Sequence, residues 1–350
     1  SKDRYKMSTV TIIGAGMMGS ALSFPLRENG NEVRLVGTPL DRAIIDAAKA
    51  DGTHITLKRR LPDGIKYYQF ENYREALDGA DLLLSGVSSF GVDWFAENVL
   101  RDLPASIPVL SVTKGMMNTD DGELVPYPEL YRRMLGRRDL HLCAIGGPCT
   151  SYELADHDQT EVCFCGDDIE LLRRIKSMFE TDYYHISLST DETGVECAVA
   201  MKNAYALGVT LAVGLAEARD GKLHYNSQAA LFGQSMREMR LLLAICGGSD
   251  ELIYLGAGDL YVTVFGGRTR LIGTLLGKGM SFEDAMRTLD GVTLESIVIS
   301  SRTAKAVRAL AAHGKADTAD FPLLMHIDSL INGGAKVNIP WNAFEHEFMI

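Results

Sequence analysis

The chain has 350 residues, and 46% of them are hydrophobic, which is enough to fill one large core or two moderate ones. It carries 35 basic against 46 acidic residues, a net charge of −11, which disfavours general nucleic-acid or anionic-membrane binders because they need a basic face. We therefore expect a soluble globular protein without a nucleic-acid partner. An anionic small substrate would need positive charge concentrated at one site.

The cysteines and the start of the chain add a few expectations. The six cysteines are scattered, and Cys163 and Cys165 lack the two-residue gap of a zinc or redox pair. We expect reduced thiols, a cytoplasmic protein and no metal site. The polar residues before Met7 resemble a leader or a remnant of cloning, and no signal peptide precedes the first expected strand.

Short β-branched runs alternate with longer segments of helical period from Thr9 to about Ser187. The expected strands are residues 9–14, 32–37, 65–70, 81–87, 107–113, 140–146, 161–166 and 183–188. Such alternation implies crossover connections between neighbouring strands. The pattern predicts an α/β fold, a Rossmann-like, doubly wound and mainly parallel sheet with helices on both faces.

The first expected strand ends in a glycine pattern, Gly14-x-Gly16-x-x-Gly19, and a helix from Ser20 to Asn29 follows it. Gly14 permits a tight turn, Gly16 lets the backbone approach a pyrophosphate, and Gly19 lets helix and strand pack closely. A purely structural turn is the alternative, but the strand–turn–helix context favours a dinucleotide site. Met17 and Met18 are expected to pack under the cofactor or into the sheet.

After about Glu192 the strand pattern gives way to helical period. The expected helices are residues 192–219, 226–246, 281–290, 295–312 and 321–332, joined by glycine-rich connectors such as GAGD and FGGRTR. We place a domain boundary near residues 189–193. Residues 1–190 would form a dinucleotide-binding domain, and residues 191–350 an all-helical substrate-binding domain.

Lys202 places one ammonium in the apolar stretch 195–215, which also contains Glu196 and Asn203. A lipid-facing helix tolerates such groups poorly, so we expect a helix buried in protein and no integral membrane segment. A buried lysine without a partner loses its proton readily and can act as a general base near neutral pH. The alternatives are a lysine that reaches solvent and a structural pair with Glu196.

Charged residues beside glycines mark three further candidate positions. Lys114 follows the fifth expected strand, at the edge that faces ligands in open parallel sheets, and can reach a substrate oxygen there. Asp259 lies in an expected glycine-rich loop that brings its carboxylate close to a partner. Arg268 and Arg270 form an expected anion pocket, since guanidinium groups suit phosphate. A charge that faces water is the alternative for each.

Six segments form one pattern by their order and spacing: IIGAGMMGSAL, SVTKG, GGPCTSYELA, GVECAVAMKNAYALG, GAGDLYVT and GGRTRLIG. Together they resemble the NAD(P)-dependent glycerol-3-phosphate dehydrogenase family, over nearly all of the chain from Met7. The resemblance implies a Rossmann-like domain and a helical domain with the substrate bound between them. It also implies a homodimer and reversible hydride transfer between NAD or NADP and carbon 2 of glycerol 3-phosphate or dihydroxyacetone phosphate.

The resemblance further implies roles for individual residues. Lys202 is similar in position to the catalytic base, Lys114 to the lysine that polarises the substrate oxygen, and Asp259 to the acid that orients both lysines. The other implied site residues are Asn203 and Thr263 in the catalytic shell, Arg268 and Thr269 at the substrate, and Gly14, Gly16, Met17, Met18, Gly19, Thr38, Arg42, Ser88, Arg268 and Glu295 at the cofactor.

The chain departs from the family pattern at three places. Thr269 stands where the family usually has Asn, Leu294-Glu295-Ser296 where it has Val-Glu-Gly, and Cys149 where it has Ser or Thr. The first two departures fall near the positions that the family uses for the substrate phosphate and the adjacent cofactor. A different small phosphorylated polyol is therefore the alternative substrate.

The choice between NAD and NADP stays open in the sequence. The site after the second strand, where an acid would hold the ribose hydroxyl, carries Gly37 and Thr38, with Asp41 and Arg42 further on. The missing acid removes the main obstacle to NADP, and Arg42 can meet its phosphate.

Two other functions fit parts of the pattern. A 3-hydroxyacid dehydrogenase also carries a Lys-Asn pair, but Lys114 and the Arg268–Arg270 segment suit a phosphate better than a carboxylate. A non-catalytic dinucleotide sensor would need neither Lys114 nor Lys202.

Overall fold

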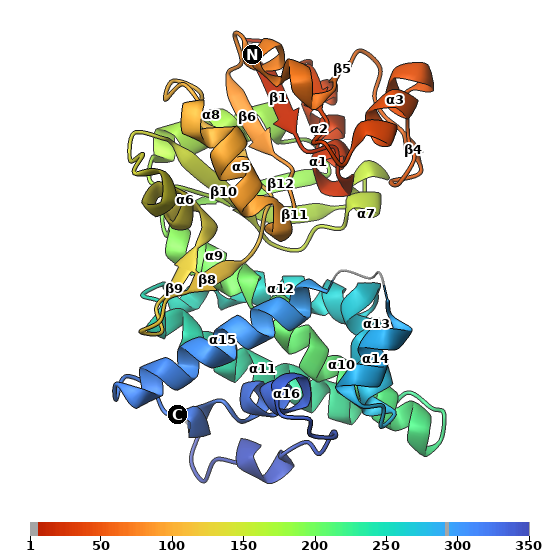
Figure 1. Ribbon diagram of the computed structural model, residues 1–350, viewed down its shortest axis with the longest axis vertical. Helices are drawn as coiled ribbons and strands as arrows, with labels where there is room; N and C mark the ends of the chain where they lie inside the picture. The colour runs from red at the N-terminus through yellow and green to blue at the C-terminus, as the bar shows by residue number, and fades with distance from the viewer. Residues whose placement is uncertain (1–5, 291–293, 350) are drawn as a thin grey trace. The chain divides into compact units, whose positions relative to one another are not determined.

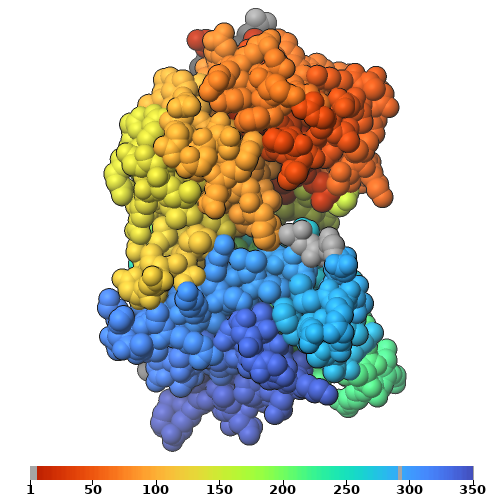
Figure 2. Space-filling view, viewed as in Figure 1, coloured from red at the N-terminus to blue at the C-terminus, as the bar shows by residue number. Residues whose placement is uncertain are grey.

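The computed structural model describes residues 6–290 and 294–349, and the polar segment before Met7 lies almost wholly outside them. The chain divides into two compact units, which Figure 1 shows as ribbons. The first contains the residues up to Lys114 and Tyr127–Val195, and the second Gly115–Pro126 and the residues from Glu196 onward. On the face shown in Figure 2, the surface of the second unit is formed largely by its C-terminal half, coloured blue.

An eight-stranded sheet flanked by helices forms the first unit. Its strands are β1 (Thr9–Ile13), β2 (Glu32–Val36), β5 (Lys66–Tyr68), β6 (Leu82–Ser85), β7 (Val109–Ser111), β10 (Leu142–Gly146), β11 (Thr160–Cys165) and β12 (Tyr184–Ser189). They lie in the order β12-β11-β10-β7-β6-β1-β2-β5, and only β10 and β11 pair antiparallel. The mainly parallel, doubly wound sheet predicted from the sequence is confirmed, and each of the eight expected runs overlaps one of these strands.

The strand order reverses at β1, because the next strand along the chain, β2, pairs on one side of it and β6 pairs on the other. In the parallel register Val10 lies between Val33 and Leu82, and these side chains are fully buried. Ligands of open α/β sheets bind at the carboxyl ends of the strands at such a reversal. The glycine pattern that follows β1 lies at this point.

Helices and a small hairpin complete the first unit. They are α1 (Met17–Ala21), α2 (Ser23–Glu28), α3 (Arg42–Asp51), β3 (Thr53–His54), β4 (Arg59–Arg60), α4 (Tyr73–Leu77), α5 (Val92–Asn98), α6 (Tyr127–Leu135), α7 (Ser151–Ala155) and α8 (Ile169–Phe179). The helix α9 (Glu192–Ala200) begins in this unit and continues into the second, which includes Glu196 and the residues after it. The helix expected at 20–29 begins earlier, at Met17, and is interrupted at Leu22. Pro25 explains the interruption, because it has no N–H to donate to the carbonyl of Ala21.

The second unit is helical apart from one hairpin. Its elements are β8 (Met116–Asn118), β9 (Leu124–Pro126), α10 (Lys202–Arg219), α11 (Tyr225–Ile245), α12 (Ile253–Val264), α13 (Gly267–Gly277), α14 (Phe282–Thr288), α15 (Glu295–Ala312) and α16 (Pro322–Asn332). The hairpin packs on α15, where Arg302 Nη1 donates to the carbonyl of Met116 at 3.1 Å. Met116 and Leu124 thereby join the core of this unit.

The prediction that GAGD is a connector is wrong, because the segment lies within α12. FGGRTR is a connector only at its start, because Phe265 and Gly266 separate α12 from α13 and the remaining residues open α13. Glycines elsewhere in this unit serve close helix packing. A Cβ on Gly277 would lie 2.2 Å from the carbonyl oxygen of Leu211, and one on Gly214 would lie 2.1 Å from that of Thr274. Only glycine permits this approach of α10 and α13.

One helix among the described residues, Glu192–Arg219, is long and apolar enough to cross a bilayer, and 83% of its apolar window is buried by the rest of the chain. It comprises α9 and α10, which meet at Met201. This burial agrees with the predicted core helix.

Candidate active site

The glycine turn after β1 is built by contacts that exclude side chains. Gly14 has φ +109°, a conformation that favours glycine, and a Cβ there would lie 2.6 Å from the carbonyl carbon of Gly86. A Cβ on Gly19 would lie 2.8 Å from the carbonyl oxygen of Gly14. Gly86, directly after β6, was not predicted as a site residue. A glycine at the end of an expected strand is visible in the sequence and could have indicated it. A Cβ on Gly86 would lie 2.5 Å from the same oxygen.

Gly16 differs from the other two glycines of the turn, because its Cβ position has only an ordinary van der Waals contact. The nearest atom to that position is the carbonyl oxygen of Gly86, at 3.6 Å. The turn is therefore crowded on the sheet side and accessible at Gly16. This is the shape that a pyrophosphate needs in order to approach the backbone, so the residues present fit a dinucleotide.

The loop after β2 offers one acid, and it is engaged with the protein. The Asp41 carboxylate accepts hydrogen bonds from the backbone N–H of Thr38 at 2.8 Å and from its hydroxyl at 2.9 Å. Arg42 is exposed and forms an ion pair with Glu71. Asp41 is therefore engaged by Thr38 instead of standing at the end of β2, where an acid would hold a ribose hydroxyl. Ser88 is exposed beyond β6, and Met17 and Met18 pack partly against the core of the first unit.

Lys114 lies beyond the carboxyl end of β7, as predicted, and belongs to the first unit. Its ammonium donates to the carbonyl of Gly147 at 3.0 Å, and Gly147 has φ +124° in the turn after β10. The lysine is half-buried rather than a freely solvated loop residue. The GGP turn and Lys114 therefore lie together at the ligand-facing strand ends.

The second unit brings Lys202 and Asp259 together. Lys202 Nζ lies 2.7 Å from Asp259 Oδ1, although the two residues are 57 positions apart in the sequence. Only 16% of the lysine side chain and 1% of the aspartate side chain are exposed. Lys202 is therefore paired with Asp259, the acid that the resemblance implied, and is not the buried lysine without a partner that its apolar surroundings predicted. Thr263 Oγ1 donates to the backbone carbonyl of Asp259 at 2.7 Å, and Asn203 is half-buried next to Lys202 in the chain.

Helix packing at Gly256 produces this ion pair. A Cβ on Gly256 would lie 2.5 Å from the carbonyl oxygen of Ala198 and 2.8 Å from the Met239 side chain, so α12 approaches α9 as closely as glycine permits. Asp259 lies three residues after Gly256 and Lys202 four residues after Ala198. Side chains three and four residues apart share a helix face, so this contact sets the spacing of the two charged groups.

The two arginines of the predicted anion pocket differ in their contacts. Arg270 Nη1 donates to the carbonyl of Val264 at 2.7 Å and so caps the end of α12. Arg268 is exposed in the first turn of α13, and no hydrogen bond or ion pair to the rest of the described chain engages its guanidinium. Thr269 beside it is buried, and Glu295 begins α15. These residues belong to the second unit.

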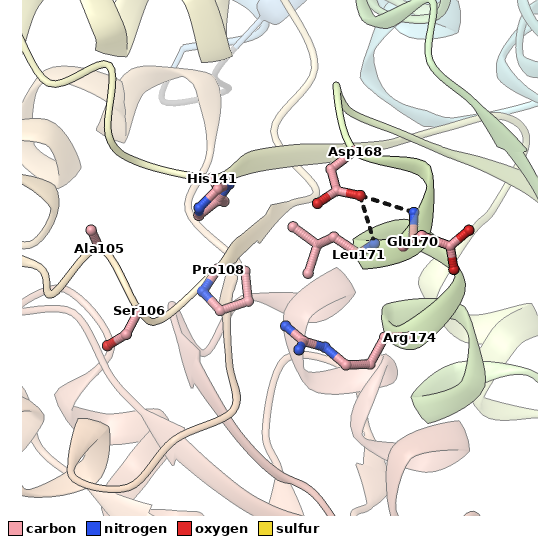
Figure 3. Close-up of a pocket in the computed structure, with 8 residues that line it drawn as sticks. All are labelled: Ala105, Ser106, Pro108, His141, Asp168, Glu170, Leu171 and Arg174. Carbon is pink, nitrogen blue, oxygen red and sulfur yellow. Dashed lines mark hydrogen bonds between the residues drawn. The ribbon is translucent and has the colours of Figure 1, made fainter.

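A separate pocket of about 300 Å³ lies at the opposite ends of the strands (Figure 3). Pro108 and His141 line it just before β7 and β10, with Arg174 from α8. The Asp168 carboxylate at its edge accepts hydrogen bonds from the N–H groups of Glu170 and Leu171 and caps α8. None of the predicted site residues lines this pocket.

Family models match both parts of the chain. Residues 9–171 match the NAD-dependent glycerol-3-phosphate dehydrogenase N-terminus and residues 191–341 the C-terminus of the same family. With its glycine turn and Rossmann-like sheet, the chain is an NAD(P)-dependent oxidoreductase that acts on a CH–OH group.

Curated relatives are similar in sequence to this chain over almost its whole length. The chain is 34% identical over 332 residues, 94% of this chain and 96% of the relative, to the NADP(+)-dependent glycerol-3-phosphate dehydrogenase of Archaeoglobus fulgidus. It is 27% identical over 334 residues, 94% of each chain, to the glycerol-3-phosphate dehydrogenase [NAD(P)+] of Koribacter versatilis. The chain belongs to the NAD-dependent glycerol-3-phosphate dehydrogenase family, which confirms the resemblance noted in the sequence.

Solved structures show the same fold. The glycerol-3-phosphate dehydrogenase of Coxiella burnetii superposes with a TM-score of 0.78 at 24% identity, over 97% of this chain and 98% of that one. The Plasmodium falciparum glycerol-3-phosphate dehydrogenase gives a TM-score of 0.81 at 18% identity, over 98% and 97%.

Proposed function

We propose that the chain catalyses reversible hydride transfer between NAD(P)(H) and carbon 2 of glycerol 3-phosphate or dihydroxyacetone phosphate. The observation that carries the proposal is the Lys202–Asp259 pair, with an N···O distance of 2.7 Å and a carboxylate that is almost wholly buried. A lysine with a fixed, buried carboxylate beside it can exchange a proton with a substrate hydroxyl. In this proposal residues 1–190 bind the cofactor and residues 191–350 supply the base.

The proton transfer uses groups of the chain itself. In the oxidising direction, the substrate hydroxyl proton passes to neutral Lys202 Nζ as hydride leaves carbon 2, and Asp259 stabilises the ammonium that results. In the reducing direction, the ammonium groups of Lys202 and Lys114 stabilise the negative charge that develops on the substrate oxygen. The bound nicotinamide supplies the acceptor or donor of hydride. Thr263 and Asn203 complete the polar surroundings of this pair.

Arg268 is the group proposed for the substrate phosphate. It lies in the first turn of the eleven-residue helix α13, after Gly266 and Gly267, and the latter has φ +76°. A guanidinium suits phosphate, and the backbone beside it has no side chains to block approach. Glu295 and Arg268 are the proposed cofactor contacts from this unit. Because Thr269 is buried where relatives usually carry Asn, another small phosphorylated polyol is the second candidate substrate.

We propose that NADP(H) is accepted alongside NAD(H). The loop after β2 has no free acid for a ribose hydroxyl, since Asp41 is bound to Thr38, and Arg42 offers a cation at its exposed edge. The Archaeoglobus relative is named as NADP(+)-dependent. Arg42 would exchange Glu71 for the 2′-phosphate.

We also propose that the protein is a cytoplasmic homodimer and that it acts in glycerophospholipid and carbohydrate metabolism. Tyr261 and Phe265 of α12 are 59% and 61% exposed and stack edge to face, and such exposed aromatic side chains are typical of protein interfaces. Light scattering at several concentrations tests the dimer.

The experiment that tests the function is the initial rate of NADH and NADPH oxidation with dihydroxyacetone phosphate beside longer phosphorylated ketoses. Fast turnover of dihydroxyacetone phosphate supports glycerol 3-phosphate as the substrate of the reverse reaction. Turnover of a longer ketose alone supports the second candidate and assigns the difference to Thr269 and Leu294-Glu295-Ser296. Absence of turnover with every phosphorylated ketose contradicts the proposal.

A further inference from the structure

Ala15, the residue between the first two glycines of the turn, has both of its backbone polar groups bound from outside the turn. Its N–H donates to Asp41 Oδ2 at 3.0 Å, and its carbonyl oxygen lies 2.7 Å from His54 Nε2. Asp41 precedes α3, and His54 lies in the β3–β4 hairpin that follows α3 (Figure 1). Two segments distant from the turn in sequence therefore hold one residue of it.

The contacts of His54 determine which of its nitrogens carries the proton. The ring is fully buried, and Nδ1 accepts a hydrogen bond from the N–H of Leu57 at 2.9 Å. A nitrogen that accepts has no proton, so the proton of the neutral ring is on Nε2. His54 is therefore a donor to the carbonyl of Ala15. No local sequence pattern indicates this role.

Asp41 reaches the turn because the loop after β2 curls tightly. A Cβ on Gly37 would lie 2.7 Å from the Ile45 side chain and 3.2 Å from the Asp41 Cβ, so only glycine permits the curl. The Gly37 N–H donates to the carbonyl of Tyr68 at 2.9 Å, which anchors the loop to β5. Asp41 Oδ2 then accepts from both Thr38 and Ala15.

These two bonds orient two consecutive peptide groups. In a trans peptide the carbonyl and the N–H point in opposite directions. Holding the Ala15 carbonyl toward His54 therefore directs the Gly16 N–H away from the hairpin. Holding the Ala15 N–H toward Asp41 directs the Gly14 carbonyl the other way, toward Gly19 and Gly86. A Cβ added at Gly19 would lie 2.8 Å from that carbonyl oxygen, and one added at Gly86 would lie 2.5 Å from it.

We propose that Asp41 and His54 are positioning residues that hold the glycine turn in its pyrophosphate-binding conformation before the dinucleotide arrives. The inference rests on the proposed function of the turn as the dinucleotide site. A site that is ordered in advance binds more tightly, because binding does not have to order it. Loss of either bond should weaken dinucleotide binding about fivefold, since a hydrogen bond of this kind contributes about 1 kcal/mol.

Two substitutions of His54 separate positioning from folding. In His54→Gln the amide nitrogen reaches the place of Nε2 and still donates to Ala15, but the acceptor for Leu57 is lost. In His54→Asn the amide oxygen takes the place of Nδ1 and accepts from Leu57, but the side chain is too short to reach Ala15. The two variants bury similar polar groups, so they differ mainly in the bond to the turn. Asp41→Ala removes the second bond at a partly exposed position.

The measurement is the dissociation constant of NADPH and of NADH from fluorescence titration, followed by KM for dihydroxyacetone phosphate and kcat at saturating cofactor. We expect His54→Asn and Asp41→Ala to raise both dissociation constants about fivefold, with kcat and the substrate KM unchanged. His54→Gln should bind nearly as the unsubstituted protein does.

Equal dissociation constants for His54→Asn and His54→Gln overturn the inference, and so does an unchanged value for Asp41→Ala. Should His54→Asn not fold, the comparison of Asp41→Ala with His54→Gln decides in its place. Failure of the unsubstituted protein to bind either dinucleotide would contradict the proposed function instead, which keeps the two failures distinct.

Discussion

The glycine turn of the first unit and the Lys202–Asp259 pair of the second are built in opposite ways. The turn is a contiguous segment in which absent side chains leave backbone groups accessible, and Gly16 is its least crowded glycine. The pair consists of two side chains that are 57 positions apart and that meet only because α12 packs closely on α9. A backbone site of this kind can be recognised from a short motif, whereas a side-chain site depends on how helices pack.

The largest expected effect comes from removing the base of the side-chain site. Lys202→Ala should lower kcat about 10³-fold, because the variant lacks the amine that is proposed to exchange the proton with the substrate. Dinucleotide binding, which the turn supplies, should be unchanged. Single-turnover kinetics and NADPH titration measure the two effects. Near-normal turnover would remove Lys202 from the mechanism, and lost dinucleotide binding would show that the two sites are not independent.

The second prediction disturbs the packing behind the pair without changing a charged group. Gly256→Ala places a methyl 2.5 Å from the Ala198 carbonyl, so α12 must shift and kcat should fall about 10- to 100-fold. Gly233 of α11 provides the matched control, because nothing lies within 4 Å of its Cβ position. Gly233→Ala should leave kcat unchanged and stabilise the helix by about 0.5–1 kcal/mol. Equal kinetics for the two variants would contradict the packing argument.

The third prediction concerns a buried acid whose hydrogen bonds also come from segments distant in the sequence. Glu238 accepts hydrogen bonds from the N–H groups of Leu323 and Leu324, from the Tyr205 hydroxyl and from the Gln234 amide. Burial raises the pKa of this carboxyl to about 7. A folded-state pKa above the usual value means that stability is full below pH 4.5 and is lost as pH rises to about 7.

Glu238→Gln should remove that pH dependence, because glutamine resembles the neutral acid. Between pH 4.5 and about 7 the free energy of unfolding should fall by up to about 3 kcal/mol in the unsubstituted chain, and this part should be absent in the variant. Urea unfolding at several pH values measures it. The same slope in both proteins would show that Glu238 is not its source.

The smallest expected effect is at the edge of the dinucleotide site. Arg42→Ala should raise the dissociation constant of NADPH about fivefold and leave that of NADH unchanged, since only NADPH has the 2′-phosphate. Glu71→Gln frees Arg42 from its ion pair and should change NADPH binding in the opposite direction. Parallel changes for both cofactors would exclude Arg42 from cofactor discrimination.

Much of the first unit could be predicted from local patterns. Each expected run overlaps a strand, and Lys114 lies beyond a strand end as predicted, because hydrophobic period and chain order suffice to predict a parallel sheet. The GAGD segment of the second unit misled the prediction, since Gly256 permits helix contact rather than a turn. A glycine can permit a positive φ in a turn or the close approach of two backbone segments, and the sequence does not distinguish these two roles.

The sequence by itself determined the alternation of strands and helices, the glycine turn, the family and the identity of the charged residues, because each of these is local or is a matter of order along the chain. Only the tertiary structure decided that Lys202 pairs with Asp259, that Arg270 caps α12 and that His54 and Asp41 hold Ala15. Each of these contacts depends on which segments pack together. That choice is made by the burial and close packing of the whole unit, which no single segment encodes.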